Sequence, residues 1–322
     1  MSITEVVNSI VHRYNKLNDY RLFTSRVLSD FSRYRRRKEL AKGGFVSSDS
    51  VSIKHQDGYV LTTKNYIEGL ENVVQTLQTY ADCKLASLNV PYLLEHGAGK
   101  GGRPVKPFYF NILTRQDLLA MPQLVDFALS DGVLNVLVPY YGLLPELSHM
   151  AVFASGFAEP FAPDSKPLGT QCLHTDNHDL KHVKLFCFLA DVGEEDGPLT
   201  LLPAEKSAWL LRKTGRRWRT APFRDDKEFL RYFSEKDLVR VTGPAGTVAI
   251  VDTTNCLHYG SRCHRNGRRT AFVIHYTLFN AYTYRYSADY EDLNMATSPE
   301  FRSRVAGDER RALVYHLLST KN

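Results

Sequence analysis

Three polar side chains in the second half of the chain have the types and the spacing of a metal site. His174 and Asp176 stand two residues apart in the run QCLHTDNHDLKH, residues 171–182. On an extended strand both would point to the same face, which places an imidazole beside a carboxylate. A third ligand is expected from a distant strand, and His258, which opens a turn after an apolar run, is the candidate. We therefore predict that His174, Asp176 and His258 bind a metal and form the catalytic centre.

Two histidines and one carboxylate cover one face of an octahedron and leave three positions open. Non-haem Fe(II) oxygenases use this arrangement, because a chelating co-substrate and dioxygen both need an open position. A different interpretation stays open, in which His174, His178 and His182 share one face of a helix and bind zinc. No HExxH glutamate accompanies them, so we expect His178 and His182 to lie behind the ligands or at the surface. His258 could instead be a core histidine, although it alone of these stands at a strand end, and His275, inside an apolar run, is expected to be packed.

An arginine follows the last of these histidines at the start of a strand-like run. Arg269 stands eleven residues after His258 and begins the run RTAFVIHYT. A guanidinium inside a β core is costly unless it is paired, and a carboxylate that accepts two hydrogen bonds is its best partner. A dicarboxylate such as 2-oxoglutarate would satisfy both sites, because its keto acid can chelate iron while its far carboxylate reaches Arg269.

Together these segments resemble the phytanoyl-CoA dioxygenase-like family of iron(II)- and 2-oxoglutarate-dependent oxygenases. The resemblance covers roughly residues 105–280 and rests on the runs HTD, DGPLTLLPAEKS and GTVAIVDTTNCLHYGS and on Arg269. It implies a double-stranded β-helix core, of the jelly-roll or cupin-like kind, and Fe(II), 2-oxoglutarate and O2 as cofactor and co-substrates. It places the iron at His174, Asp176 and His258 and the far carboxylate of 2-oxoglutarate at Arg269.

Three further positions follow from the same resemblance. Gln171, three residues before the first ligand, matches a position that touches the co-substrate in several relatives, although an ideal strand would turn it away from His174. Gly260 stands two residues past the distal histidine, where many relatives have serine or glycine, and Ser261 is next. Asp176 matters because related halogenases have glycine or alanine there, which opens a position for a halide.

With Asp176 present, the resemblance implies a hydroxylase or another enzyme that abstracts hydrogen. The expected reaction oxidises an unactivated C–H of a small-molecule substrate and releases succinate and CO2. The protein would contribute orientation and the exclusion of water, since the metal and the co-substrate supply the chemistry. An alternative from a different class is a nucleic-acid-binding or sensing protein that retains the fold without turnover.

The elements that must position these residues change in character along the chain. Residues 1–150 are expected to be mostly helical, with apolar residues every three or four positions over 3–17, 22–40, 66–85, 116–129 and 133–141. Residues 151–285 contain short β-branched and aromatic runs separated by turns, which indicates a β core with the metal site. Residues 286–322 are expected to form a helical tail. We predict one α+β domain over residues 1–322, in which the N-terminal helices support the β-helix core.

Charge is concentrated in two clusters. The chain of 322 residues has a net charge of +6, while residues 33–42 (RYRRRKELAK) and 212–219 (RKTGRRWR) each carry +5, so the remainder is about −4. We expect the first cluster to be a solvated helix face, and nucleic acid to be an unlikely partner because few aromatic residues accompany the positive charges. The second cluster lies between two predicted core strands, where it could bind an anionic group of the small-molecule substrate.

Composition and cysteine content also indicate the class of protein and its cellular compartment. Hydrophobic residues make up 43% and charged residues 24%, which is typical of a globular domain. The five cysteines include no CxxC pair and no secretory leader is expected, which indicates reduced thiols in a cytoplasmic protein. The most apolar stretch, residues 133–144, is interrupted by polar residues, proline and glycine, so no membrane partner is expected. The sequence does not indicate an oligomeric state.

Overall fold

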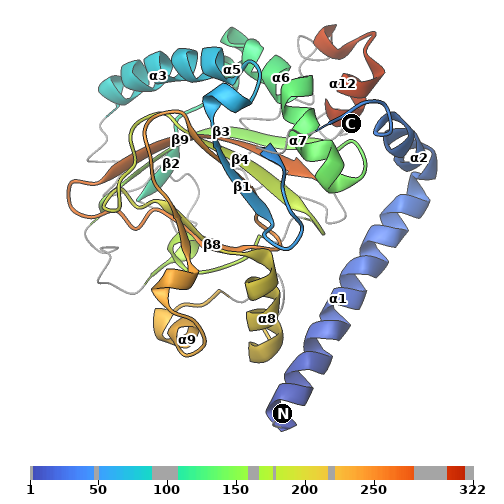
Figure 1. Ribbon diagram of the computed structural model, residues 1–322. Helices are drawn as coiled ribbons and strands as arrows, with labels where there is room; N and C mark the ends of the chain where they lie inside the picture. Colours follow the sequence, from blue (N-terminus) through green and yellow to red (C-terminus); the bar gives the residue numbers. More distant parts are fainter. Residues whose placement is uncertain are drawn as a thin grey trace.

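The computed structural model describes residues 3–46, 51–88, 108–158, 167–176, 179–216, 222–278 and 303–315. Two antiparallel sheets form its centre, with helices around them (Figure 1). The chain is therefore a mixed α and β protein, as the sequence predicted. The site residues lie between and beside these two sheets.

The larger sheet has six strands. Their spatial order is β1 (Tyr59–Thr63), β7 (Thr247–Asp252), β4 (His182–Phe188), β9 (Arg268–Thr277), β3 (Glu146–Gly156) and β2 (Tyr109–Asn111). Each neighbouring pair is antiparallel. Because β4 and β9 are rich in β-branched and aromatic residues, they suit a sheet that is covered on both faces.

The smaller sheet carries one of the candidate ligands. Its order is β6 (Val239–Val241), β5 (Leu199–Leu202) and β8 (Leu257–Tyr259). An isolated bridge joins His174 to His258, and another joins Leu173 to Phe223. The segment before Asp176 thus lies along the free edge of β8.

Alternation along the strands separates two apolar clusters. On β4, Val183, Leu185 and Cys187 belong to the core between the larger sheet and the helices. The next residue, Phe188, belongs to a second cluster with Leu201 and other residues between the two sheets. Because successive side chains point to opposite faces, the odd-numbered positions of β4 pack under the helices and the even-numbered positions face the smaller sheet.

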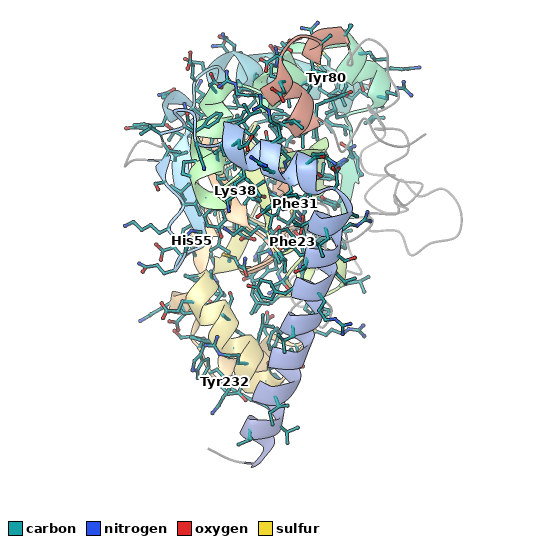
Figure 2. The ribbon with its side chains drawn as sticks, turned by 90° about the vertical axis from the view of Figure 1, so that its right-hand side faces the viewer. Phe23, Phe31, Lys38, His55, Tyr80 and Tyr232 are labelled. Atoms are coloured by element: carbon teal, nitrogen blue, oxygen red, sulfur yellow. The ribbon has the colours of Figure 1, made fainter. Side chains whose placement is uncertain are left out.

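Helices lie on both sides of this pair of sheets. Four of them cover the larger sheet in Figure 1: α3 (Leu70–Ser87), α5 (Arg115–Ala120), α6 (Gln123–Ala128) and α7 (Asp131–Tyr141). Two others lie on the side of the smaller sheet: α8 (Ala204–Thr214) and α9 (Asp226–Leu230). The long helix α1 (Ile3–Ser29) runs alongside α8, as the view from the side in Figure 2 also shows, and leads into α2 (Phe31–Leu40).

The predicted helices are present, but two are interrupted. The stretch 22–40 breaks at Asp30, whose φ of −143° is not helical, so it belongs partly to α1 and partly to α2. The stretch 116–129 is divided into α5 and α6 where Met121 and Pro122 stand, because proline cannot donate the hydrogen bond that a continuous helix requires.

The boundary expected at residue 150 differs from the structure. Strands β1, β2 and the first part of β3 precede it and pair within the larger sheet. In β3 nearly every residue is buried on both faces, so the period of two that marks a half-exposed strand is absent. The run TQCLHTD is also not a regular strand, since residues Gly169–Gln171 form a short 3-10 helix.

The structure also bears on the predicted C-terminal tail, the cysteines and membrane helices. Most of the predicted helical tail 286–322 lies outside the described residues, and in its described part, residues 303–315, α12 (Glu309–Tyr315) is helical. The single domain over residues 1–322 stays a prediction. All five cysteines are free, and four of them are buried. Within the described residues no helix is both long enough and apolar enough to cross a membrane.

The basic run 33–42 is only partly a solvated face. Arg37 is fully buried and donates from Nε to the carbonyl of Leu144 at 2.7 Å and from Nη2 to that of Leu278 at 2.6 Å. Its Nη1 lies 3.2 Å from a carboxylate oxygen of Glu146, which also pairs with Arg33. The cluster therefore joins α2 to the edge of the larger sheet, which a charge count could not reveal.

Candidate metal centre

Backbone pairing brings the first and last predicted ligands together. The amide of His174 donates to the carbonyl of His258 at 3.0 Å, and the amide of His258 donates to the carbonyl of His174 at 2.8 Å. Their ring centroids lie 4.4 Å apart. The amide of Asp176 donates to the carbonyl of Thr253 at 2.9 Å, which holds the HTD segment against the turn between β7 and β8.

The three predicted ligands present their donor atoms to one point. Asp176 Oδ1 lies 4.0 Å from His174 Nε2, and Oδ2 lies 3.9 Å from His258 Nε2. One ligand atom from each of the three lies within 4.8 Å of the others. That spacing gathers the three donors around one point, where histidine nitrogens and a carboxylate oxygen could hold one small cation.

Hydrogen bonds fix the tautomer of both imidazoles. His174 Nδ1 lies 2.7 Å from the carbonyl of Cys172, and His258 Nδ1 lies 3.0 Å from that of Cys256. A carbonyl can only accept, so each Nδ1 must carry the hydrogen, and in the neutral ring Nε2 then keeps its lone pair. Metal-binding histidines are commonly oriented in this way by a partner on the other ring nitrogen.

The charges of His258 and Asp176 also suit a cation. Burial lowers the pKa of His258 to about 3, and the neighbouring His174 adds to this effect, so the ring is neutral near pH 7. Burial alone would raise the pKa of Asp176, but Lys184 and His182 hold it well below its ordinary value. A carboxylate and neutral imidazoles are the forms that bind metals.

A buried aspartate shapes the turn that leads to His258. Asp252 ends β7 and accepts hydrogen bonds from the hydroxyl of Tyr140 and the amide side chain of Asn255, both at 2.7 Å. The backbone amide of Thr254 donates to its other oxygen at 3.1 Å. Sequence reasoning did not identify this role, although an aspartate followed by polar turn residues (DTTN) is a signal for it.

The predicted carboxylate anchor, Arg269, lies at the start of β9 with its guanidinium partly covered. Its Nη1 donates to the carbonyl of Gly197 at 2.6 Å and its Nη2 to the hydroxyl of Ser261 at 3.1 Å. Burial lowers the pKa of Arg269 from its ordinary value, yet no carboxylate lies within ion-pair distance of it among the described residues. A buried guanidinium without a carboxylate nearby is suited to bind a carboxylate from a ligand.

Glycine at 260 permits this placement of the guanidinium. A Cβ at Gly260 would lie 3.1 Å from both terminal nitrogens of Arg269. The next residue, Ser261, has a φ of 63°, which is uncommon for a residue other than glycine. Ser261 also lies 3.0 Å from the hydroxyl of Ser155. The loop after β8 is therefore shaped around the arginine.

Gln171 joins this second group of residues. It lies in the 3-10 helix Gly169–Gln171, and its amide nitrogen donates to the carbonyl of Ser261 at 3.1 Å. Arg262 donates to the backbone carbonyl of Gln171 at 2.6 and 2.8 Å. The expectation from an ideal strand does not apply, because the backbone at Gln171 is helical, and the structure places Gln171 and Arg269 around the same serine.

The interpretation of His174, His178 and His182 as a helical zinc site is wrong for His174 and His182. His174 lies in an extended bridge and His182 begins β4, so the two do not share a helix. His178 lies outside the described residues. His182 does lie behind a ligand, with its Nδ1 3.5 Å from Asp176 Oδ2.

Sequence reasoning missed Lys184, which is the nearest cation to a predicted ligand. Its Nζ lies 2.8 Å from Asp176 Oδ2, and its side chain is 14% exposed. The signal was a single lysine at an even-numbered position of the apolar strand HVKLFCF, a position that faces the smaller sheet.

The second basic cluster is only partly described. Arg216 pairs with Glu228, and its guanidinium lies 4.1 Å from the ring of Phe223. Residues 217–219, which include Trp218, lie outside the described residues. Anion binding by the loop 212–219 therefore stays a prediction.

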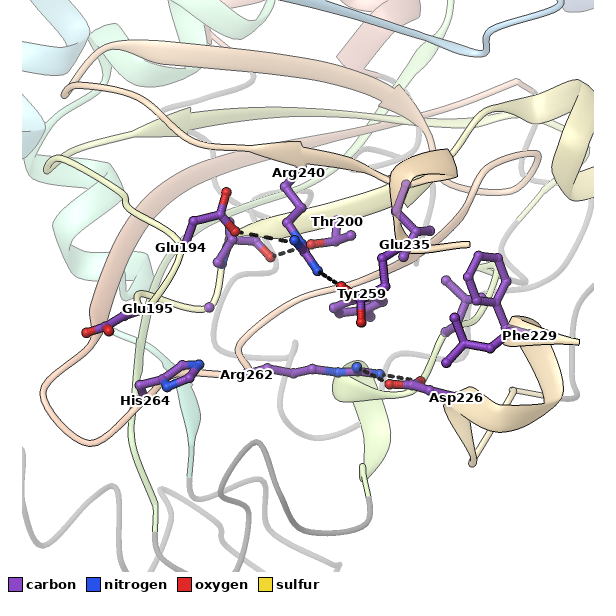
Figure 3. Close-up of a pocket in the computed structure, with 15 residues that line it drawn as sticks. Glu194, Glu195, Thr200, Asp226, Phe229, Glu235, Arg240, Tyr259, Arg262 and His264 are labelled. Carbon is purple, nitrogen blue, oxygen red and sulfur yellow. Dashed lines mark hydrogen bonds and ion pairs between the residues drawn. The ribbon is translucent and has the colours of Figure 1, made fainter. Parts of the chain in front are cut away.

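A pocket of about 450 Å³ lies on the outer face of the smaller sheet (Figure 3). Arg262 crosses it, with Nη1 2.6 Å from Asp226 and its guanidinium 3.7 Å from the ring of Tyr259. Arg240 pairs there with Glu235 at 2.9 Å. Because Tyr259 directly follows the inward-facing His258 on β8, this pocket and the metal centre lie on opposite faces of the sheet.

Comparisons with solved structures give distant similarities. The α-ketoglutarate-dependent carbocyclase SnoK of nogalamycin biosynthesis is 16% identical, with 73% of this chain and 85% of SnoK covered and a TM-score of 0.45. HygX of Streptomyces hygroscopicus, with nickel and 2-oxoglutarate bound, is 14% identical over 72% of this chain and 87% of HygX, with a TM-score of 0.41. EctD of S. alaskensis, with 2-oxoglutarate and 5-hydroxyectoine, is 17% identical over 73% of this chain and 77% of EctD, with a TM-score of 0.44.

Non-haem iron and 2-oxoglutarate chemistry thus recurs among these solved structures, and a further structure of EctD contains iron. No protein-family model matches the sequence, and the search of curated proteins also finds no match.

Proposed function

We propose that the chain is an Fe(II)- and 2-oxoglutarate-dependent dioxygenase of the phytanoyl-CoA dioxygenase-like family that hydroxylates a C–H of a small molecule. One observation carries the proposal: His174, Asp176 and His258 direct two Nε2 lone pairs and an ionised carboxylate to one point. The arginine without a carboxylate partner, Arg269, supports it from the co-substrate side.

We further propose that the two sheets are the halves of a double-stranded β-helix within one domain, residues 1–322. The order β7-β4-β9-β3 in the larger sheet and β6-β5-β8 in the smaller, with the His174 segment on the edge of β8, supports this assignment. From β6 to β9 the successive strands alternate between the two sheets, which brings residues far apart in the sequence to a shared centre.

The residues have distinct roles in the proposed reaction. His174, Asp176 and His258 would hold the iron, which with 2-oxoglutarate and O2 would supply the oxidising power; 2-oxoglutarate would become succinate and CO2, and the second oxygen atom of O2 would go to the substrate. Arg269 would bind the far carboxylate of 2-oxoglutarate through its two terminal nitrogens. Gln171 would support the loop at Ser261 and border the co-substrate.

The chain's own geometry then contributes orientation and the exclusion of water. The carbonyls of Cys172 and Cys256 keep the hydrogens of both imidazoles on Nδ1. The apolar cluster between the sheets, which includes Phe188, Leu201 and Val273, keeps bulk water from the neighbourhood of the site.

The alternative of a nucleic-acid-binding protein without turnover receives less support. In the cluster 33–42, Arg33 and Arg37 are engaged with Glu146, and Arg36 pairs with Glu309. These arginines are therefore not presented as a row of free positive charges. The free thiols support a reducing compartment such as the cytoplasm as the proposed location.

An anaerobic titration tests the proposed function. Fe(II) and 2-oxoglutarate together should give a visible charge-transfer band, and His174→Ala should abolish it, because one of three ligands is lost. His264→Ala is the matched control, since His264 is exposed and lies on the outer pocket. A wild-type protein without a band, or a band that survives in His174→Ala, would contradict the assignment.

A further inference from the structure

The inner face of the larger sheet carries a row of nitrogen-bearing side chains beside Asp176. Lys184 of β4 pairs in register with His275 of β9, and His275 pairs with His149 of β3. Residues directly opposite one another on neighbouring strands share a face, so the three side chains form one row. The rings of His149 and His275 lie 4.9 Å apart, and that of His182 lies 5.1 Å from His275.

This row contains polar atoms that the described residues do not satisfy. His275 is 5% exposed, and its Nε2 is buried without a hydrogen-bond partner in the described part of the chain. The hydroxyl of Thr277, two residues further along the same face, is also buried without a hydrogen-bond partner among the described residues. Buried polar atoms nearly always have a partner, so two of them on one face indicate a place for a polar group from a ligand.

The row carries one positive charge. Burial lowers the pKa of His149 to about 3 and that of His275 well below its ordinary value, and Lys184 adds to both effects. The ammonium of Lys184 has Asp176 as its single carboxylate within ion-pair distance among the described residues.

Charge balance shows what the row lacks once the proposed metal and co-substrate are bound. The two charges of Fe(II) are balanced by Asp176 and the chelating carboxylate of 2-oxoglutarate, and Arg269 is balanced by the far carboxylate. Lys184 then remains as a largely buried cation whose carboxylate partner is shared with the metal. A buried charge without its own counter-ion is costly, so one further negative charge would stabilise the site.

We propose that Lys184 and His275, with His149 beside them, bind a carboxylate group of the prime substrate. The inference rests on the proposed function and adds the substrate class. One ammonium together with N–H groups of neutral imidazoles suits a single negative charge, whereas a phosphate monoester would bring a second charge with no partner. Because Lys184 contacts Asp176, a carboxylate bound there would hold the rest of the substrate next to the metal.

The test measures binding of a simple probe without turnover. Propanoate is titrated by calorimetry into the anaerobic protein with Fe(II) and saturating 2-oxoglutarate, which keeps the Arg269 site occupied. We expect saturable binding that Lys184→Met weakens by at least about 30-fold, since a buried charge partner is lost. His275→Phe keeps all charges and should weaken binding by about 5-fold, the effect of one hydrogen bond.

Two controls sharpen the test. Lys206→Met removes the same charge from an exposed pair with Asp237 and should bind propanoate like the wild type, and Lys184→Arg should retain most of the affinity. Inorganic phosphate should bind more weakly than propanoate.

The outcomes separate this inference from the proposed function. The charge-transfer band should persist in Lys184→Met; with the band present, undiminished propanoate binding in both Lys184→Met and His275→Phe would overturn the carboxylate site. Tighter binding of phosphate would overturn the carboxylate class, and loss of the band in Lys184→Met would show that Lys184 only positions Asp176. A wild-type protein without the band would instead overturn the proposed function.

Discussion

At the scale of single residues, backbone carbonyls prepare the two imidazoles for a metal. Each carbonyl stands two residues before its histidine and takes the Nδ1 hydrogen, so no side chain is needed to orient the ring. Arg269 is placed in a comparable way by the carbonyl of Gly197 and the hydroxyl of Ser261. The protein therefore provides hydrogen-bond acceptors for part of each imidazole and of the Arg269 guanidinium, and the remaining polar atoms are left for a ligand.

Removing the guanidinium should separate co-substrate binding from metal binding. We expect Arg269→Ala to weaken 2-oxoglutarate binding by about 3 kcal/mol, roughly 100-fold, because a largely buried charge pair is lost. Fe(II) binding should remain, since Arg269 contacts none of the proposed ligands. Calorimetry with each component measures both, and Arg268→Ala, an exposed neighbour, is the control. Equal losses of metal and 2-oxoglutarate affinity would refute the role of Arg269.

At the scale of elements, the turn between β7 and β8 decides where His258 stands. Asp252 has no exposed surface, and its carboxylate is the shared acceptor for Tyr140 of α7 and for the turn that follows. Asp176 is joined to the same turn through the carbonyl of Thr253. Two of the three proposed ligands therefore depend on one local structure.

Asp252→Ala should destabilise this turn strongly. The substitution leaves the Tyr140 hydroxyl and the Asn255 amide without their acceptor inside the protein, and we expect a loss of about 3 kcal/mol in the free energy of unfolding. Urea denaturation measures it. Asp237→Ala, which removes a half-buried carboxylate that caps a short 3-10 helix, should cost less, about 1 kcal/mol. Similar stability of the two variants would show that the buried network contributes little.

The sequence could predict the features that have a local pattern. The strands β4, β5, β7 and β9 are recognisable because each is a short apolar run between turns. Two of the proposed ligands are recognisable because they stand together in the run HTD. Lys184 was missed because its row depends on His275, which is 91 residues away in the sequence, and β-pairing over that distance leaves no local signal. β3 was missed because burial on both faces removes the alternation.

At the scale of the whole molecule, one ion cluster connects the N-terminal helices to the sheet. Arg37 reaches the carbonyls of Leu144 and Leu278, and it shares Glu146 with Arg33. Charged residues on a helix usually face water, and the period of the sequence cannot show which arginine turns inward. The cluster thus fixes α2 against the ends of β3 and β9.

Glu146→Gln should reveal this connection. The change removes the carboxylate that the buried Arg37 shares with Arg33, and Arg33 keeps Asp30 at 3.5 Å. We expect a loss of about 3 kcal/mol in the free energy of unfolding, as for other broken buried pairs. Glu39→Gln breaks an exposed pair with Arg35 on the same helix and should have little effect. Denaturant unfolding of both variants decides the matter, and an unchanged midpoint for Glu146→Gln would rule out a stabilising role.

The pairing of His174 with His258 has a consequence for the entropy of the unfolded chain. The two residues are 84 positions apart, and the segment between them contains β4, α8, α9 and β7. An ion shared by both side chains would act as a reversible cross-link that closes this long loop, and cross-links across long loops lower the entropy of the unfolded chain most. A metal in such a position would fasten the edge of the smaller sheet, where an isolated bridge to His258 holds the segment that carries His174.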